Sequence, residues 1–95
     1  MDKYLVVVEK SETGYSAYSP DVVGCIATGK TIEKTIANMK TALALHLHNM
    51  AEDGEALPTP RGIASYLEAI NNSEGEEYFL AHIMMKHVLP ELAHA

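Results

Sequence analysis

The sequence is short of cysteine, tryptophan and basic residues. Its single cysteine, Cys25, cannot form a disulfide within the chain, which excludes a disulfide-stapled scaffold. No apolar run approaches the length of about 20 residues that a membrane-spanning helix needs. The first residues also lack a basic segment followed by an apolar one, so we expect no signal peptide. Together these absences predict a cytoplasmic protein.

Basic residues are outnumbered, with 7 Lys and Arg against 13 Asp and Glu and a formal net charge of -6. A nucleic-acid-binding domain needs a clustered basic face, so the composition argues against this function. The acidic residues gather at 52–55 and at 74–77. These runs are either two solvated loops or an acidic surface that meets a basic partner, where charge complementarity helps capture and partner choice.

Apolar residues make up 47% of the 95 residues, enough for one folded domain. Residues 4–8 are β-branched and apolar on both faces, as in a central strand. A second strand at residues 15–19 should stop at Pro20, which cannot donate to a strand ladder. After a Pro-Asp turn, residues 25–28 form a short third strand. These segments predict a three-stranded antiparallel meander and an α+β fold.

A long helix is expected from residue 32 to residue 53. Thr31 is suited to the N-cap position and Gly54 to the position just after the end of the helix. Leu45 lies off the apolar stripe of this helix, and either widens its buried face or marks a second contact surface. The stripe should cover one side of the meander and consists of Ile32, Ile36, Met39, Leu43, Leu47 and Met50.

A shorter helix is predicted after residue 59, with Thr59 as N-cap and Pro60 at its first position. Its apolar stripe is Ile63, Leu67 and Ile70. Residues 78–85 combine side chains that suit a strand with others that favour a helix, and their periodicity does not decide between the two. We expect a single domain over residues 1–95, with a core within about 3–86 and a loose tail over 87–95.

Residues 24–31 match the phosphate-loop pattern G-x-x-x-x-G-K-[ST], in which Lys30 would hold phosphates and Thr31 would bind magnesium. We interpret the match as coincidental, because its middle is strand-like and no apolar strand ending in aspartate follows. Cys25 could act as a nucleophile beside a histidine. A lone cysteine is more often a small buried apolar side chain, and we favour that interpretation.

The five histidines do not form a recognisable metal motif. His46 and His48 diverge on a helix, while His82 and His87 are poorly aligned on either a strand or a helix. Asp21 is the one carboxylate near the turn, and alone it cannot supply an acid–base pair. Turn formation is sufficient to explain it. We therefore expect no catalytic, cofactor-binding or metal-binding residue, and the sequence favours a binding protein over an enzyme.

One stretch carries a more specific signal. A strand, a Pro-Asp-x-x-Gly-Cys turn and a Gly-x-Thr helix start follow one another between Tyr15 and Glu33. This arrangement resembles the HicB family of antitoxins, with its UPF0150-type domain, and the resemblance covers most of residues 4–85. The chain departs from the family pattern at Lys30, which replaces a usual acid, and at residues 34–35. The motif residues are Pro20, Asp21, Gly24, Cys25, Gly29 and Thr31.

The resemblance implies a partial ribonuclease-H-like fold without ribonuclease activity, with the order β-β-β-α-β, and it favours a strand at residues 78–85. HicB proteins typically bind a small basic toxin, HicA, that cleaves messenger RNA. They mask its active site and often form dimers or larger assemblies. The resemblance thus implies an antitoxin of a type II pair that neutralises its toxin by stoichiometric occlusion. The candidate partner-binding residues are Glu74, Glu76 and Glu77.

Two alternatives remain open. The chain could be an orphan structural or regulatory module that forms a homodimer or tetramer without a toxin, or an enzyme that uses Cys25 or the Gly-Lys-Thr run. Many HicB proteins also carry a C-terminal DNA-binding domain. This chain ends too soon after Met85 to hold one, which argues against DNA binding by residues 1–95.

Overall fold

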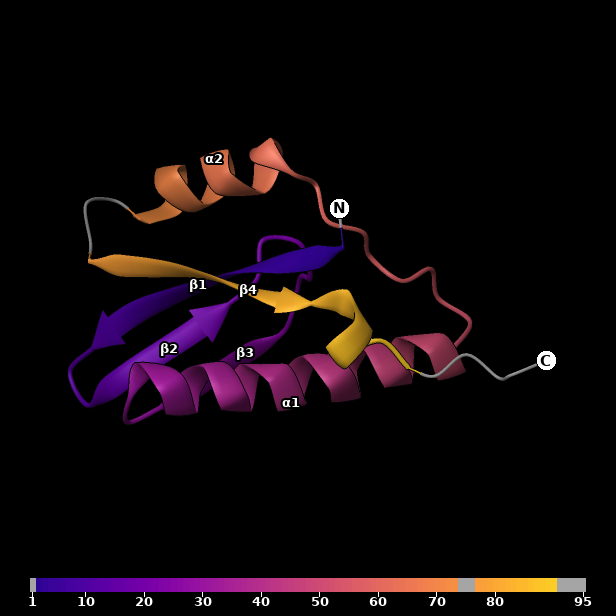
Figure 1. Ribbon diagram of the computed structural model, residues 1–95, viewed down its shortest axis with the longest axis horizontal. Helices are drawn as coiled ribbons and strands as arrows, with labels where there is room; N and C mark the ends of the chain where they lie inside the picture. The colour runs from indigo at the N-terminus through magenta and orange to yellow at the C-terminus, as the bar shows by residue number, and fades with distance from the viewer. Residues whose placement is uncertain (1, 74–76, 91–95) are drawn as a thin grey trace.

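The computed structural model describes residues 2–73 and 77–90, which form a four-stranded antiparallel sheet with two helices (Figure 1). The strand order is β3-β2-β1-β4. This arrangement confirms the predicted α+β fold, its element order and the choice of a strand for the last segment. The elements are β1 (Lys3–Ser11), β2 (Gly14–Tyr18), β3 (Ile26–Gly29), α1 (Ile32–Glu52), α2 (Ile63–Ser73), β4 (Tyr78–Met84) and a 3-10 turn, η1 (Met85–His87).

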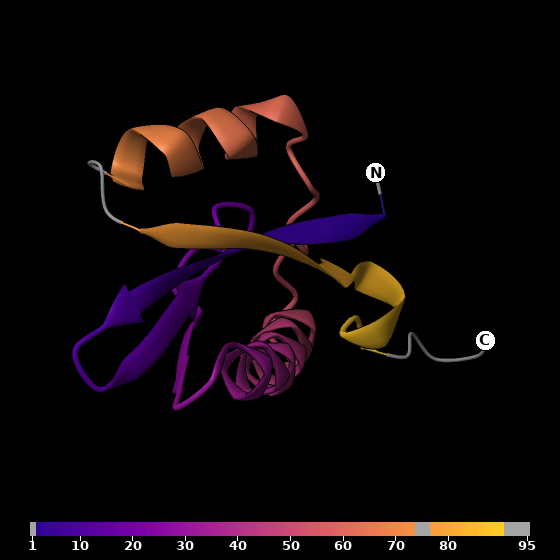
Figure 2. The same cartoon turned by 60° about the vertical axis from the view of Figure 1, so that its left-hand side comes forward.

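The first strand, β1, lies at the centre of the sheet. It pairs antiparallel with β2 on one side, where Val7 lies opposite Tyr18, and with β4 on the other, where Val6 lies opposite Ala81. The two helices lie on opposite faces of the sheet, α1 on one and α2 on the other (Figure 2). Residues 4–8 are therefore buried on both faces, which confirms the prediction of a central strand.

The long helix α1 begins and ends near the predicted residues. The Thr31 hydroxyl accepts a hydrogen bond of 3.0 Å from the Lys34 amide, so Thr31 is the N-cap. Asp53 is the C-cap, and Gly54 follows with a φ of 74°, a conformation that favours glycine. Leu45 is 62% exposed, so it does not widen the buried face. The core on this side of the sheet comprises Tyr4, Val6, Val8, Ala17, Val22, Cys25, Met39, Leu43, Leu47, Ile83 and Val88.

The short helix α2 begins later than predicted, and its apolar stripe is exposed. It begins at Ile63 rather than Pro60, after Gly62 adopts a φ of 65°. The predicted apolar stripe faces away from the sheet: Ile63 is 75% exposed, Leu67 54% and Ile70 53%. Ser65 and Ala69 are buried against the sheet instead. Periodicity identifies an apolar side of a helix but not the direction in which it faces, and here a polar contact orients the helix.

Smaller differences concern the ends of elements. The third strand begins at Ile26, so Cys25 lies just outside it, and the first hairpin has a tight turn at residues 12–13. Val88 is buried and Leu89 packs beside it, so the core extends past residue 86, where we expected the tail to begin. Within residues 2–73 and 77–90, neither helix has the length and apolar character required to cross a bilayer.

Candidate functional site

The turn after β2 contains a buried carboxylate, Asp21, which is only 7% exposed. Its Oδ2 accepts a hydrogen bond of 2.8 Å from the Leu5 amide in β1. Its Oδ1 accepts one of 3.1 Å from the Arg61 amide and another from the Ser65 hydroxyl in α2. The interpretation of Asp21 as a turn residue is therefore incomplete, because its carboxylate joins β1, the link before α2, and α2 itself.

The side chains of Ser19 and Asp21 extend the pairing of β1 beyond the end of β2. The Ser19 hydroxyl donates to the Leu5 carbonyl oxygen at 2.7 Å and accepts from the Asp21 amide at 3.1 Å. At Leu5 the strand β2 has already ended, so these side chains take the place of a neighbouring strand. Buried backbone groups need such partners, because leaving them unpaired costs free energy.

The Arg61 side chain completes this polar cluster. Its Nη2 donates to the Pro20 carbonyl oxygen at 2.7 Å and lies 3.2 Å from the Glu68 carboxylate. Its Nε lies 3.9 Å from Asp21 Oδ1. Both Asp21 oxygens are thus bound by groups of the same chain, and the carboxylate joins α2 to the sheet. We call Ser19, Asp21, Arg61 and Ser65 the polar node.

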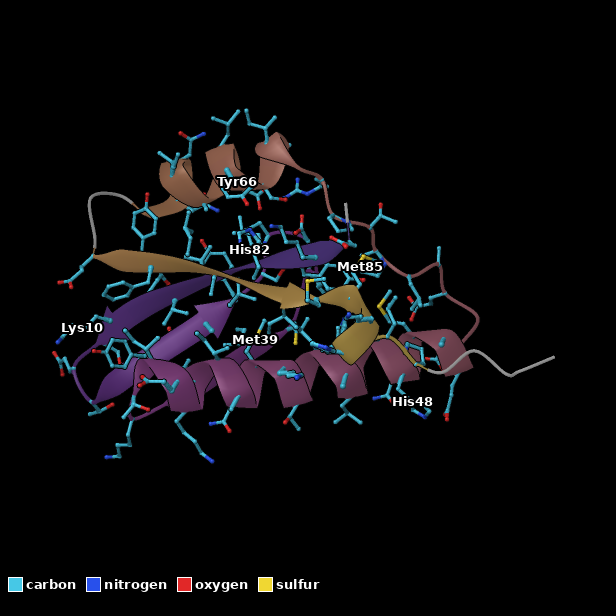
Figure 3. The ribbon with its side chains drawn as sticks, viewed as in Figure 1. Lys10, Met39, His48, Tyr66, His82 and Met85 are labelled. Carbon is cyan, nitrogen blue, oxygen red and sulfur yellow. The ribbon has the colours of Figure 1, made fainter. Side chains whose placement is uncertain are left out.

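A second contact between α2 and the sheet joins Tyr66 to His82. The Tyr66 hydroxyl is hydrogen-bonded to Nε2 of His82, and the two side chains point toward one another between α2 and β4 (Figure 3). Partial burial and the nearby charge of Lys3 lower the pKa of His82, whereas Asp21 acts in the opposite direction. His82 is therefore held as a neutral side chain at neutral pH.

Among the described residues, Cys25 and His46 line the same groove between the start of β3 and α1. His48 pairs with Glu52 at 2.8 Å on the exposed side of α1. Burial raises the pKa of the Cys25 thiol, which opposes its use as a nucleophile. Among the described residues, no set of three His, Cys, Asp or Glu side chains is placed to hold a metal ion.

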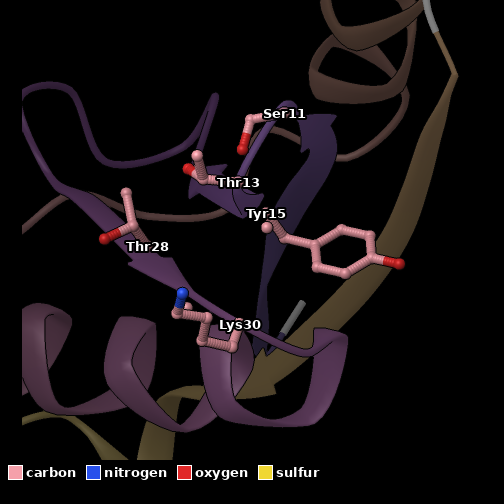
Figure 4. A pocket seen from close by; sticks show the side chains of 7 residues that line it. Ser11, Thr13, Tyr15, Thr28 and Lys30 are labelled. Carbon is pink, nitrogen blue, oxygen red and sulfur yellow. The ribbon is translucent and has the colours of Figure 1, made fainter.

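The phosphate-loop pattern at residues 24–31 is folded as a turn, a strand and a helix cap. Ala27 and Gly29 pair with β2, so their backbone groups belong to the sheet. A hollow of about 270 Å³ lies between this strand end and the first hairpin (Figure 4). The side chains labelled there carry hydroxyl groups, with the exception of the amine of Lys30. They belong to Ser11, Thr13, Tyr15, Thr28 and Lys30.

Among the described residues, two groups of exposed apolar side chains are placed to contact a partner, since exposed apolar patches often mark interaction sites. The first is Ile26 and Leu45, which line a groove of about 230 Å³ near the start of β3, with the exposed Val23 close by in the sequence. The outer stripe of α2 is the second. Phe79 and Leu80 on β4 are also exposed, but they lie on opposite faces of the sheet, because Phe79 is opposite Val8 and Leu80 is opposite Val7. Of the predicted partner-binding residues, Glu77 is exposed next to β4, while Glu74 and Glu76 lie outside the described residues.

Comparison with protein families gives a match over residues 4–93 to the model described as the HicB_like antitoxin of bacterial toxin-antitoxin systems. The chain belongs to this family. The motif residue Asp21 belongs to the polar node, and the carbonyl oxygen of the motif residue Pro20 accepts a hydrogen bond from Arg61 of the node. Arg61 and Ser65, which complete the node, were not identified from the sequence.

Individual relatives agree with this assignment. An uncharacterised 14.9 kDa protein of Haemophilus phage HP1 is 34% identical over 90 residues, which cover 87% of this chain and 65% of the phage protein. A UPF0150 protein of Helicobacter pylori is 40% identical over 47 residues, covering 50% of this chain and 65% of that protein. The chain thus spans about two thirds, 65%, of the length of the curated relatives it matches.

Solved structures of the family share the fold. A chain in the HicA3 and HicB3 toxin-antitoxin complex superposes with a TM-score of 0.70 and 26% identity, covering 84% of this chain and 93% of that chain. The antitoxin HicB3 crystal structure gives a TM-score of 0.70 and 26% identity, covering 85% of this chain and 60% of that chain. The HicB-like strands and helices described above are therefore those of the family.

Proposed function

We propose that this chain is the antitoxin of a type II toxin–antitoxin pair and neutralises a small basic HicA-type toxin that cleaves messenger RNA. Membership of the HicB-like antitoxin family is the observation that carries the proposal. The similarity to a chain in the HicA3 and HicB3 complex supports a toxin as the partner. This role would be carried out in the cytoplasm, where messenger RNA is found.

The mechanism that we propose is stoichiometric occlusion without catalysis. The chain has a formal net charge of -6, which suits a basic partner whose surface binds RNA. Charge complementarity accelerates capture, and apolar contacts such as those offered by Leu45 and Leu80 slow dissociation. The buried carboxylate, Asp21, already has partners within the chain, which supports a non-enzymatic role.

The test is affinity capture from the native host, followed by an RNA-cleavage assay with the captured toxin. Capture in 0.5 M salt, where the Debye length is about 4–5 Å, removes loosely held ionic partners. We expect a small basic protein near one-to-one, and cleavage should stop once the chain equals the toxin in concentration. Persistent cleavage at a large excess of the chain would contradict occlusion.

We propose Glu74, Glu76 and Glu77 as the acidic contact with the toxin. Glu77→Lys should slow toxin capture and flatten its dependence on salt, because an exposed charge acts mainly on the association rate. Glu55→Lys is the matched control, since it makes the same charge change in the other acidic run. If the two variants bind the toxin equally fast, the contact surface lies elsewhere.

A second candidate function is that of an orphan homo-oligomeric module without a toxin. The exposed Leu45, outside the buried face of α1, motivates it. Recovery of the chain alone from its host, as a dimer or tetramer, favours this role over the antitoxin.

A further inference from the structure

The hollow between the first hairpin and the end of β3 is bordered by hydrogen-bond donors. Three of them are the hydroxyl groups of Ser11, Thr13 and Thr28, and the fourth is the amine of Lys30. Among the described residues that line the hollow, none carries a carboxylate. Within residues 2–73 and 77–90, no hydrogen bond or ion pair joins any of these four side chains to another group of the chain. The donors are therefore available to a ligand.

The register of the sheet explains how the hollow forms. Ser11 lies opposite Gly14, while Thr28 lies opposite Ser16, the next residue of β2 on the same face as Gly14. Ser11, Gly14 and Thr28 therefore share one face of the sheet. Gly14 has no side chain to fill the space between the other two. A Cβ at this position would clash with the Gly29 carbonyl oxygen, so the close approach of the two strands keeps the space open.

Lys30 gives the hollow its positive charge. Figure 4 shows its amine extending from the end of β3 toward the hairpin that carries Ser11 and Thr13. Glu12 lies between these two residues in the sequence but does not line the hollow. The donors thus approach one space from the hairpin and from the end of β3, with a cation on one side.

We propose that this hollow binds a phosphate group, either as free phosphate or as the terminal phosphate of a larger molecule. A phosphate carries oxygens on all sides that accept hydrogen bonds, and lysine binds phosphate as a point charge. The volume of about 270 Å³ is below the range of about 300–1,000 Å³ that is typical of pockets for drug-sized ligands. The hollow therefore suits the phosphate group itself rather than a whole nucleotide.

The site is separate from two features of the same segment. The phosphate-loop pattern would bind phosphate through backbone amides, but Ala27 and Gly29 pair with β2. At the start of α1, the Lys34 amide donates to the Thr31 hydroxyl, so the chain itself caps the helix. The HicB pattern usually has an acid in place of Lys30, and an acid there would repel an anion. Phosphate binding is thus a property of this chain, and it does not rest on the proposed antitoxin role.

The test is a titration of the chain with inorganic phosphate, followed through the NMR amide shifts of residues 11–14 and 28–30. We expect a saturable shift, and Lys30→Gln should weaken binding by about tenfold or more, because it removes the charge that faces the phosphate. Lys34→Gln is the matched control, since it makes the same charge change outside the hollow, and it should bind within about twofold of the wild type. Thr28→Val, which keeps the shape and removes one donor, should bind about threefold more weakly.

Adenosine monophosphate and sodium chloride complete the experiment. Equal affinity for phosphate and adenosine monophosphate would show that the phosphate group alone is recognised, whereas tighter binding of the nucleotide would identify a larger phosphate ester as the ligand. Sodium chloride at the same ionic strength should give no saturable shift.

Three results would overturn the proposal. They are the absence of a saturable shift with phosphate, an equal shift with chloride, and a loss for Lys34→Gln as large as that for Lys30→Gln. The last two would show that anions are attracted to exposed lysines in general. None of these results would affect the antitoxin role, which is measured separately by RNA cleavage.

Discussion

The two faces of the sheet hold their helices by different forces. On one face, α1 lays Met39, Leu43 and Leu47 over the apolar side of β1. On the other face, the buried apolar cluster of the described residues consists of Leu5, Val7 and Ala69, with three half-buried tyrosines around it. There α2 is positioned by the Asp21 carboxylate, which binds both its Ser65 and the Arg61 amide just before it.

The difference matters because apolar contacts are non-directional, whereas hydrogen bonds to a carboxylate require particular atoms. The α1 face should tolerate changes of shape that conserve volume. The α2 face should depend on a few atoms, since a buried donor that loses its partner is costly. Changes on the two faces should therefore differ in how far their effects spread through the molecule.

Leu43→Ala should give the largest loss of stability. Leu43 is fully buried beneath the sheet, and truncation of such a leucine leaves a cavity that costs about 2–5 kcal/mol of unfolding free energy. Denaturant unfolding followed by circular dichroism measures the loss. Leu45→Ala, two residues along the same helix but exposed, should change stability by less than about 0.5 kcal/mol. Equal losses for the two variants would contradict the assignment of the α1 core.

Asp21→Ala should lower the free energy of unfolding slightly less than Leu43→Ala, and its effect should fall mainly on α2. It leaves the Leu5 amide, the Arg61 amide and the Ser65 hydroxyl without their acceptor, and we expect a loss of about 2–4 kcal/mol. Hydrogen exchange should show that α2 loses protection while α1 keeps most of it. Glu68→Ala, which removes an exposed partner of Arg61, is the control and should cost less than about 1 kcal/mol. Uniform loss of protection across both helices would show that the polar node is not specific to α2.

The same contrast explains which parts of the fold could be predicted. The α1 stripe was identified from apolar residues that recur at helical spacing, and its members Met39, Leu43 and Leu47 are buried in one core, with Ile36 and Met50 packed against it. The α2 stripe follows the same rule but faces outward, since the contact that orients α2 joins Asp21 to Ser65, 44 positions apart. A polar contact between such distant residues leaves no periodic signal. The Pro-Asp motif located the turn, but it did not reveal which distant groups its carboxylate binds.

Ser65→Ala should have an intermediate effect. It removes one donor to Asp21 and leaves the two backbone amides in place, so the expected loss is about 1 kcal/mol, partly offset by the higher helix propensity of alanine. Thermal unfolding measures the change. Ser16→Ala is a suitable control, because Ser16 lies in β2 away from the polar node. A loss as large as that of Asp21→Ala would mean that Ser65, rather than the amides, carries most of the contact.

His82 should produce the smallest effect, visible only as a dependence on pH. Its pKa in the folded chain lies below the ordinary value of 6.5, so the folded state binds fewer protons than the unfolded state near that pH. The contribution of His82 to folding stability is therefore fully present above pH 6.5, and it is lost as the pH falls through the lowered pKa of the folded state. The unfolding free energy of His82→Gln should depend less on pH between about pH 7 and pH 5 than that of the wild type. The difference should be less than about 0.5 kcal/mol, because the His82 side chain is largely exposed to solvent. If the His82 variant instead becomes less stable in acid relative to the wild type, then the imidazole gains a proton on folding. The pKa of His82 would then be raised in the folded chain, which would contradict this prediction.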